Sequence, residues 1–150
     1  MKSLFNAADN AAIITRIESL TQAHTPQWGK MNVGQMVVHC QRPLQVAFGE
    51  LKLKRTLIGM LFGSMAKRKL AQEKPWDRNM PTDSHFKIAA IDHDLEAEKQ
   101  KLISLVRRFA AEGPGAITQE PHPFFGKLST QEWDAIQTNH LHHHLSQFGA

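Results

Sequence analysis

The chain has 150 residues, of which 41% are hydrophobic and 21% charged, so it is long enough for one ordinary domain and too apolar to be intrinsically disordered. Its longest strongly apolar run, residues 57–62, is far shorter than the about 20 residues that a membrane span requires. A single cysteine, Cys40, excludes an internal disulfide.

The net charge of +4 is unevenly distributed. Residues 1–75 carry 11 Lys and Arg against 4 Asp and Glu, whereas residues 76–150 carry 7 against 10. A basic cluster in the first half consists of Lys52, Lys54, Arg55, Lys67, Arg68 and Lys69. Such a cluster can track nucleic-acid phosphates or an anionic membrane surface, but no aromatic residues interleave with these charges and no groove-reading motif is present. We favour a solvated helix face, and expect neither nucleic acid nor membrane as a partner.

The N-terminal residues and the cysteine content bear on where the protein is located. Asn6, Asp9 and Asn10 interrupt any apolar core of a signal peptide, so export by that route is not expected. A lone cysteine fits a reducing compartment. The expected location is the cytoplasm.

Two helices are predicted in the first third of the chain. Isoleucine and leucine recur at helical spacing over residues 9–22. Asn32 and Gln35 form a capping-box pattern, which predicts that a second helix begins after Asn32 and continues toward Gly49. Pro43 should kink this helix, because its ring removes a backbone donor.

The middle of the chain combines a third helix with a long loop. Residues 54–72 mix large apolar side chains with the basic residues named above, and Gly59 and Gly63 weaken the helical propensity. Residues 75–91 contain Pro, Asp and Asn and indicate an ordered loop, with a short extended piece at residues 86–91.

A fourth helix is predicted to begin at Asp92 or Asp94. Acidic residues lie in its first turns and Arg107 and Arg108 in its last, which is the distribution that the helix dipole favours. The sequence Glu-Gly-Pro-Gly at residues 112–115 should end it.

The last helix should begin after a second capping box, formed by Ser129 and Glu132, and run to about Phe148. Helices joined by short connections, with almost no strand pattern, predict a single all-α domain over residues 1–150. The expected architecture is an up-and-down bundle of four main helices plus one extra.

The most informative feature is a histidine cluster in this last helix, which holds four of the nine histidines within residues 140–144. At about 100° per residue, His140 and His144 share the face that also carries apolar residues. His142 falls on the opposite side with Ala135 and Ser146, so it should face solvent. His143 falls at the edge of the inner face, where it can line a pocket or donate a hydrogen bond to a ligand.

Histidines at positions i and i+4 of a helix have Cβ atoms roughly 6 Å apart, so both rings can reach one ion at about 2.0–2.1 Å. The pattern is weak by itself, and a third candidate, His39, strengthens it. His39 borders the apolar face of the second helix, where a lone histidine is ordinarily a core residue satisfied by one hydrogen bond. Inward histidines on two facing helices converge, however, and a metal ion satisfies nitrogens that would otherwise be buried without partners. We therefore hypothesise one divalent metal ion on His39, His140 and His144.

Five stretches together resemble a branch of the DinB/YfiT-like superfamily, and the resemblance covers nearly the whole chain. Its most specific motif is the closing HxxHHLxQFG. The stretches are WGKM at 28–31, QMVVH at 35–39, HPFFGKL at 122–128, EW at 132–133 and HLHHHLSQFG at 140–149.

The resemblance implies a four-helix up-down-down-up bundle with an additional short helix. It also implies a pocket that holds a zinc or nickel ion on three histidines, which map to His39, His140 and His144. His143 is a motif residue without an assigned ligand role. The residues expected to line the pocket or to orient the ligands are Trp28, Phe125, His143 and Gln147. Trp28 and Phe125 can equally well fill the ends of the bundle.

Three functions remain open. Relatives in the superfamily include thiol-dependent S-transferases, so the favoured hypothesis is a metal-dependent transferase that acts on small electrophiles with an anionic low-molecular-weight thiol. A metal-dependent hydrolase ranks second, because hydrolysis needs a general base near the ion. Asp134 does not share the face of His140 and His144, and no other carboxylate of the last helix does. The third hypothesis is a non-catalytic metal-binding or stress-related module, in which the ion stabilises the bundle or a homodimer. Cys40 is expected to be a buried, inert thiol.

Overall fold

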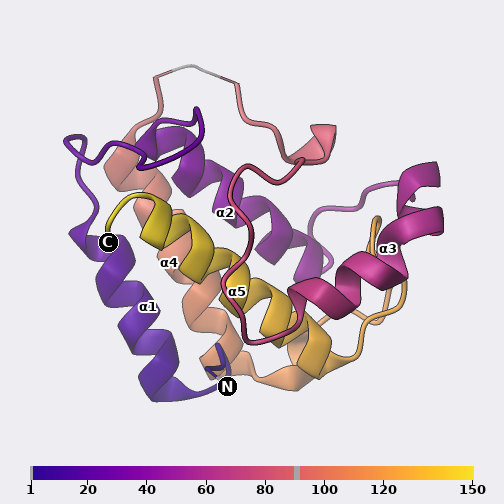
Figure 1. Ribbon diagram of the computed structural model, residues 1–150. Coiled ribbons are helices and arrows are strands. Elements are labelled where there is room, and N and C mark those ends of the chain that lie inside the picture. The colour runs from indigo at the N-terminus through magenta and orange to yellow at the C-terminus, as the bar shows by residue number, and fades with distance from the viewer. Residues whose placement is uncertain (1, 90–91) are drawn as a thin grey trace.

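The computed structural model describes residues 2–89 and 92–150, and this part of the chain is all-helical (Figure 1). The only bridge between extended residues in it joins His122 and Gly126. Its elements are α1 (Ala7–Ser19), α2 (Val33–Ala47), α3 (Leu57–Leu70), the short 3-10 helix η1 (Ser84–Phe86), α4 (Leu95–Glu112), the short 3-10 helix η2 (Pro114–Ala116) and α5 (Thr130–Gln147).

The helix starts follow the caps that the sequence predicts. Asn32 and Gln35 form a reciprocal capping box before α2, and Ser129 and Glu132 form a second one before α5. The Asp94 side chain accepts from a backbone N–H in the first turn of α4, which begins one residue later. These local hydrogen bonds satisfy backbone donors that have no partner within the helix.

Other boundaries differ from the prediction. The helix expected over residues 9–22 begins earlier, at Ala7, because the side chain of Asn6 caps it. Arg107 and Arg108 lie a turn before the end of α4, so they do not occupy its last turn, and Arg108 pairs instead with acidic side chains. In the loop over residues 75–91, Phe86 ends the 3-10 helix η1 where an extended piece was expected to begin. The end of that expected piece, at residues 90–91, lies outside the described residues.

Four helices pack around one hydrophobic core. Helix α4 packs against α1 and α2, and α5 packs against the same two helices. Helix α3 lies to one side of these four in Figure 1 and contacts α5. The largest fully buried side chains include Trp133, Phe109, Leu4, Ile13, Met36, Leu102 and Leu141. None of the helices in the described residues is both long and apolar enough to cross a membrane.

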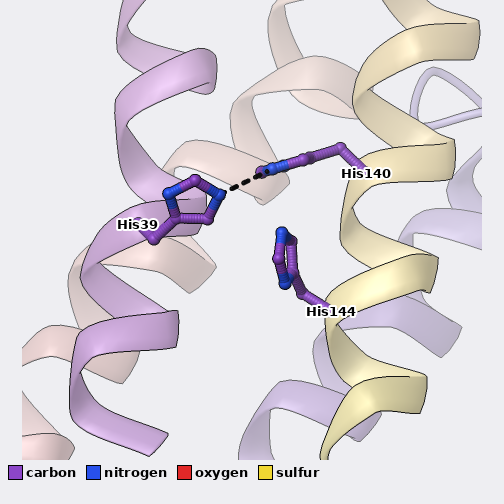
Figure 2. A group of neighbouring side chains, drawn as sticks. All are labelled: His39, His140 and His144. Atoms are coloured by element: carbon purple, nitrogen blue, oxygen red, sulfur yellow. Dashed lines mark hydrogen bonds between the residues drawn. The ribbon is translucent and has the colours of Figure 1, made fainter. Parts of the chain in front are cut away.

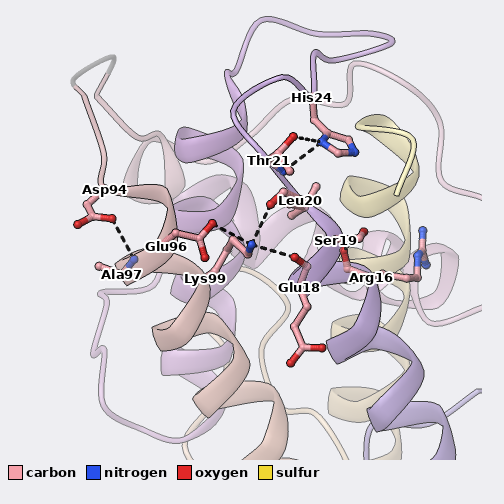
Figure 3. A network of polar contacts seen from close by, with 10 residues as sticks. All are labelled: Arg16, Glu18, Ser19, Leu20, Thr21, His24, Asp94, Glu96, Ala97 and Lys99. Atoms are coloured by element: carbon pink, nitrogen blue, oxygen red, sulfur yellow. Dashed lines mark hydrogen bonds and ion pairs between the residues drawn. The ribbon is translucent and has the colours of Figure 1, made fainter.

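A buried lysine joins α4 to the end of α1 (Figure 3). The Lys99 ammonium donates to the carbonyl oxygens of Glu18 and Leu20 at 2.9 and 2.8 Å, and to the Glu96 carboxylate at 3.0 Å. The carbonyl groups at the end of a helix have no partner within the helix, so the lysine satisfies part of this requirement for α1. Three bonds to oxygen also make the burial of its charge tolerable.

Helix α5 is buried on more sides than a one-sided amphipathic helix would be, and this overturns one prediction. His142 was expected to face solvent, but it is half-buried and its Nδ1 lies 2.6 Å from the guanidinium of Arg16 on α1. Ala135, expected on the same outer side, is buried, although Ser146 is exposed. The reason is that α1, α2 and α3 all pack against α5, so most directions around it point into protein.

Candidate metal centre

The three candidate ligands come from two facing helices. His39 lies in the middle of α2, and His140 and His144 lie on successive turns of α5, which packs against α2. Figure 2 shows the three rings pointing into the space between the two helices. One nitrogen of each ring lies within 4.8 Å of a nitrogen of the other two. The predicted convergence of these side chains is therefore confirmed.

A backbone carbonyl determines the tautomer of His39. Its Nδ1 lies 2.8 Å from the carbonyl oxygen of Phe86. Because a carbonyl oxygen only accepts, Nδ1 must carry the hydrogen of the neutral ring. The lone pair is then on Nε2, which lies 3.0 Å from Nε2 of His140. This nitrogen is available as a ligand.

A side-chain amide determines the tautomer of His144 in the same way. The Nε2 of Gln147 donates to the carbonyl oxygen of Trp28 at 2.6 Å, which fixes the orientation of the amide. The amide oxygen of Gln147 therefore faces His144, at 2.8 Å from Nδ1, and accepts its hydrogen. His144 also presents a lone pair on Nε2. Hydrogen bonds of this kind commonly orient metal-bound histidines.

His140 differs because it has no such partner among the described residues. Its Nδ1 is buried without a hydrogen bond, and its Nε2 faces the lone pair on Nε2 of His39. In the neutral His140 ring a hydrogen on Nε2 donates to the lone pair on Nε2 of His39, and a metal ion could take the place of that hydrogen. Three neutral imidazoles that present nitrogen to one point match the donor set of zinc and fit nickel as well. The residues therefore fit the predicted ion.

Burial keeps the three rings neutral. It lowers the pKa of His144 to about 3 and the pKa of His140 well below the ordinary value, with neighbouring histidines contributing in the same direction. Burial also lowers the pKa of His39, partly opposed by its hydrogen bond to Phe86. Neutral imidazole is the form that binds a metal ion.

The group of side chains that could hold a metal ion in the described residues contains three histidines and no carboxylate. Asp134 on α5 instead accepts from the backbone N–H of Leu4 at 2.8 Å and from the Thr138 hydroxyl at 3.3 Å. It therefore tethers the N-terminal segment.

Two tryptophans and His143 surround the cluster. The ring of His143 lies 5.0 Å from that of His144 and 5.5 Å from that of Trp28, as centroid distances. Trp76 lies 5.7 Å from His140 and 5.9 Å from His143. Trp76 was not among the residues expected at the site, although a tryptophan in a loop rich in Pro, Asp and Asn is itself a signal of a specific contact.

The described part of the connection after α3, up to residue 89, lies against the two helices that carry the histidines. Asn139 donates to the carbonyl oxygens of Leu70 and Gln72, both at 2.9 Å, and Gln35 donates to that of Ile88 at 3.0 Å. Together with the bond from His39 to Phe86, these contacts hold the connection against α2 and α5. This role could not be predicted from the sequence, because all four acceptors are backbone carbonyl oxygens.

Phe125 belongs to a tight turn. The Nδ1 of the buried His122 accepts from the backbone N–H groups of Phe124 and Phe125 at 3.0 and 3.1 Å. The Phe125 ring packs on that of His122 at 4.5 Å. This explains the HPFFG stretch as turn chemistry, and a role of Phe125 in a pocket stays a prediction.

Cys40 follows His39 but is buried in the core. Its thiol contacts the sulfur of Met36 at 3.7 Å, and burial raises the pKa of the thiol far above its ordinary value. The expected burial of this thiol is confirmed, and its low reactivity stays a prediction.

Comparison with known proteins finds one family model, described as "Protein of unknown function (DUF1569)", which matches residues 2–150. Neither the curated proteins nor the solved structures contain a match.

Proposed function

The chain belongs to the DUF1569 family, and from its three-histidine cluster we propose that it is a metal-dependent protein that holds one zinc or nickel ion on His39, His140 and His144. The observation that carries this proposal is the pair of hydrogen bonds to Phe86 and Gln147. These bonds leave Nε2 of His39 and of His144 as lone-pair donors inside the same buried cluster.

We further propose that α1, α2, α4 and α5 form an up-down-down-up bundle of the DinB/YfiT-like type. The packing of α4 and α5 against both α1 and α2 supports this arrangement. The closing HxxHHLxQFG motif supports it as well, because its two outer histidines, His140 and His144, are the ones that meet His39.

The reaction that we favour is transfer of a low-molecular-weight thiol to a small electrophile. Three protein ligands leave coordination positions open, and a bound divalent ion supplies Lewis acidity that lowers the pKa of a thiol or water. Trp28, Trp76 and His143 provide flat walls beside the ligands. The guanidinium of the exposed Arg78 lies 4.4 Å from the Trp28 ring, a position that suits an anionic thiol.

Two alternatives rank lower. A hydrolase needs a general base near the ion, and the described cluster contains no carboxylate, which leaves His143 as a poor substitute. A purely structural ion is usually enclosed by four protein ligands, and only three residues converge in the described part of the chain.

Metal analysis tests the binding proposal. After loading and dialysis, the wild type should retain one ion per chain, whereas His39→Ala and His140→Ala should retain none. His142→Ala is the matched control, because this residue lies on the same helix but contacts Arg16. Equal metal content in all four proteins would contradict the proposal.

A thiol assay tests the reaction. The loaded protein is mixed with an alkylating electrophile and glutathione, bacillithiol or mycothiol, and loss of thiol is followed. We expect turnover with at least one thiol that is absent in His140→Ala. If no thiol gives metal-dependent turnover, the transferase hypothesis is wrong even where the metal is bound.

A further inference from the structure

Helix α3 presents a large apolar face to solvent. The large hydrophobic side chains that are exposed in the described part of the chain all belong to this helix, and they are between 51% and 75% exposed. They are Leu57, Ile58, Met60, Leu61, Phe62 and Met65. Scattered exposed hydrophobic residues need no explanation, but a continuous patch on one helix indicates an interaction surface.

The helix docks through its smallest residues. Gly59 and Gly63 are its buried positions, and a Cβ atom would lie only 2.7 Å from the carbonyl oxygen of Phe124 at the first and 2.1 Å at the second. At about 100° per residue, the two glycines share one side of the helix, and Leu61 and Met65 lie on the other. An ordinary amphipathic helix turns its large apolar side chains toward the protein, whereas α3 turns them toward solvent.

Polar contacts hold α3 in this orientation. Lys67 forms an ion pair with Glu132 at 3.0 Å and donates to the carbonyl oxygen of Lys127 at 3.3 Å. Asn139 on α5 holds the carbonyl oxygen of Leu70 at the end of the helix. Turning the apolar side inward would break these contacts, so the exposed face is built into the fold.

The sequence of the helix and of its flanks carries charge of a single sign, and the acidic groups that pair with it, Asp77 and Glu132, come from outside this stretch. Residues 51–72 contain six Lys and Arg and no Asp or Glu. Lys52, Lys54 and Arg55 are exposed before the helix, and Arg68 and Lys69 are exposed at its end. An apolar helix face bordered by cations is the pattern of a helix that lies in the surface of an anionic bilayer.

We propose that α3 is a membrane-surface anchor that inserts Leu57, Leu61, Phe62 and Met65 into an anionic lipid bilayer, while the basic residues at both ends bind phosphate headgroups. The sequence favoured a solvated helix face with no membrane partner, and this proposal departs from that expectation because the apolar side chains of α3 are exposed. The inserted helix lies in the plane of the membrane, which agrees with the finding that no described helix is long and apolar enough to span it.

The charges beside α3 favour an anionic membrane over a second copy of the chain as the partner of its apolar face. An antiparallel pair of α3 helices would bring Lys54 and Arg55 of one copy close to Arg68 and Lys69 of the other, and a parallel pair would bring like ends together. Either arrangement opposes cations to cations, whereas anionic headgroups neutralise them.

Vesicle cosedimentation of the full chain tests the proposal. Wild-type protein should bind vesicles of phosphatidylcholine mixed with phosphatidylglycerol, bind at least about tenfold less to phosphatidylcholine alone, and dissociate at high salt. The double variant Leu61→Ser, Phe62→Ser should lose binding by at least about tenfold and still fold, because both side chains are exposed.

A matched pair of charge variants separates local from overall charge. Lys52→Gln, Lys54→Gln, Arg55→Gln should weaken binding strongly. The control Lys30→Gln, Lys87→Gln, Arg107→Gln removes the same charge at exposed positions that neither belong to α3 nor flank it. It should bind almost as well as wild type.

Three outcomes would overturn the proposal. The first is equal binding of the wild type to neutral and anionic vesicles, and the second is an equal loss of vesicle binding in the two charge variants. The third is a wild-type protein that does not bind anionic vesicles but forms a dimer in analytical ultracentrifugation, and a double variant that is monomeric. The last outcome would identify a second copy as the occupant. None of these results depends on the metal.

Discussion

The Nε2 atoms of His39 and His140 lie 3.0 Å apart although 101 positions separate the two residues in the chain. The contact joins α2 to α5 through ring nitrogens rather than apolar groups. Its position inside the bundle gives this contact its significance, because buried nitrogens need a partner. Four predictions follow from the cluster and from the contacts that support the fold around it.

Gln147 is predicted to control metal affinity without touching the ion. Gln147→Leu removes the acceptor that holds the hydrogen of His144 on Nδ1, and loss of such an orienting group typically weakens binding about 10–100-fold. Gln147→Glu keeps an acceptor for His144 but loses the donor to Trp28, so this variant should lose less metal affinity than Gln147→Leu. Competition with a fluorescent zinc chelator measures the zinc affinity of both variants. Wild-type affinity in the leucine variant would show that the bond has no role in binding.

Metal release should need a lower pH than ordinary histidine ligands imply. Protonation of a ring nitrogen removes its lone pair, so affinity falls as the pH falls. Burial lowers the pKa of His144 to about 3 and lowers those of His39 and His140, so protons compete only below the ordinary value of 6.5. Chelator competition across pH checks this, and half-release at 6.5 or above would contradict it.

Lys99 is predicted to stabilise the fold strongly. Lys99→Met fills a similar volume but leaves the carbonyl oxygens of Glu18 and Leu20 without their donor. The buried carbonyl oxygen of Leu20 left unsatisfied costs about 1–3 kcal/mol and the part-buried one of Glu18 costs less, so the free energy of unfolding in urea should fall by more than about 1 kcal/mol. Lys101→Met, an exposed lysine of the same helix that pairs with Glu98, should change it by less than about 1 kcal/mol. Equal effects would rule out this role.

Gly63 is predicted to be required for the docking of α3. Gly63→Ala would place a Cβ atom 2.1 Å from the carbonyl oxygen of Phe124, and overpacking of this kind costs about 1–3 kcal/mol. Alanine favours a helix over glycine by about 1 kcal/mol, which offsets part of that cost. Limited proteolysis within α3 should therefore be faster in Gly63→Ala. The control is Gly115→Ala, where nothing lies within 4 Å, and equal rates in both variants would contradict the packing argument.

The sequence alone was sufficient for features that depend on neighbouring residues. The capping boxes of Asn32 and Ser129 begin α2 and α5 as predicted, because a side chain three residues away satisfies the free backbone donors. The spacing of His140 and His144 follows from helix geometry in the same way. The approach of His39 to His140 and His144 could also be predicted, because the apolar pattern of each helix indicated that its histidines face inward.

Tertiary packing decided the rest. The sequence pattern predicted that His142 is solvent-facing, and only the position of α1 gives it a contact with Arg16. Likewise, the tautomer of His39 depends on a backbone carbonyl group 47 residues away, and a residue of any type can supply such a group. Periodicity reports which residues of one helix share a face, but neighbouring elements determine what that face meets. Helix α3 is the clearest case, because its glycines face the protein and its leucines face outward.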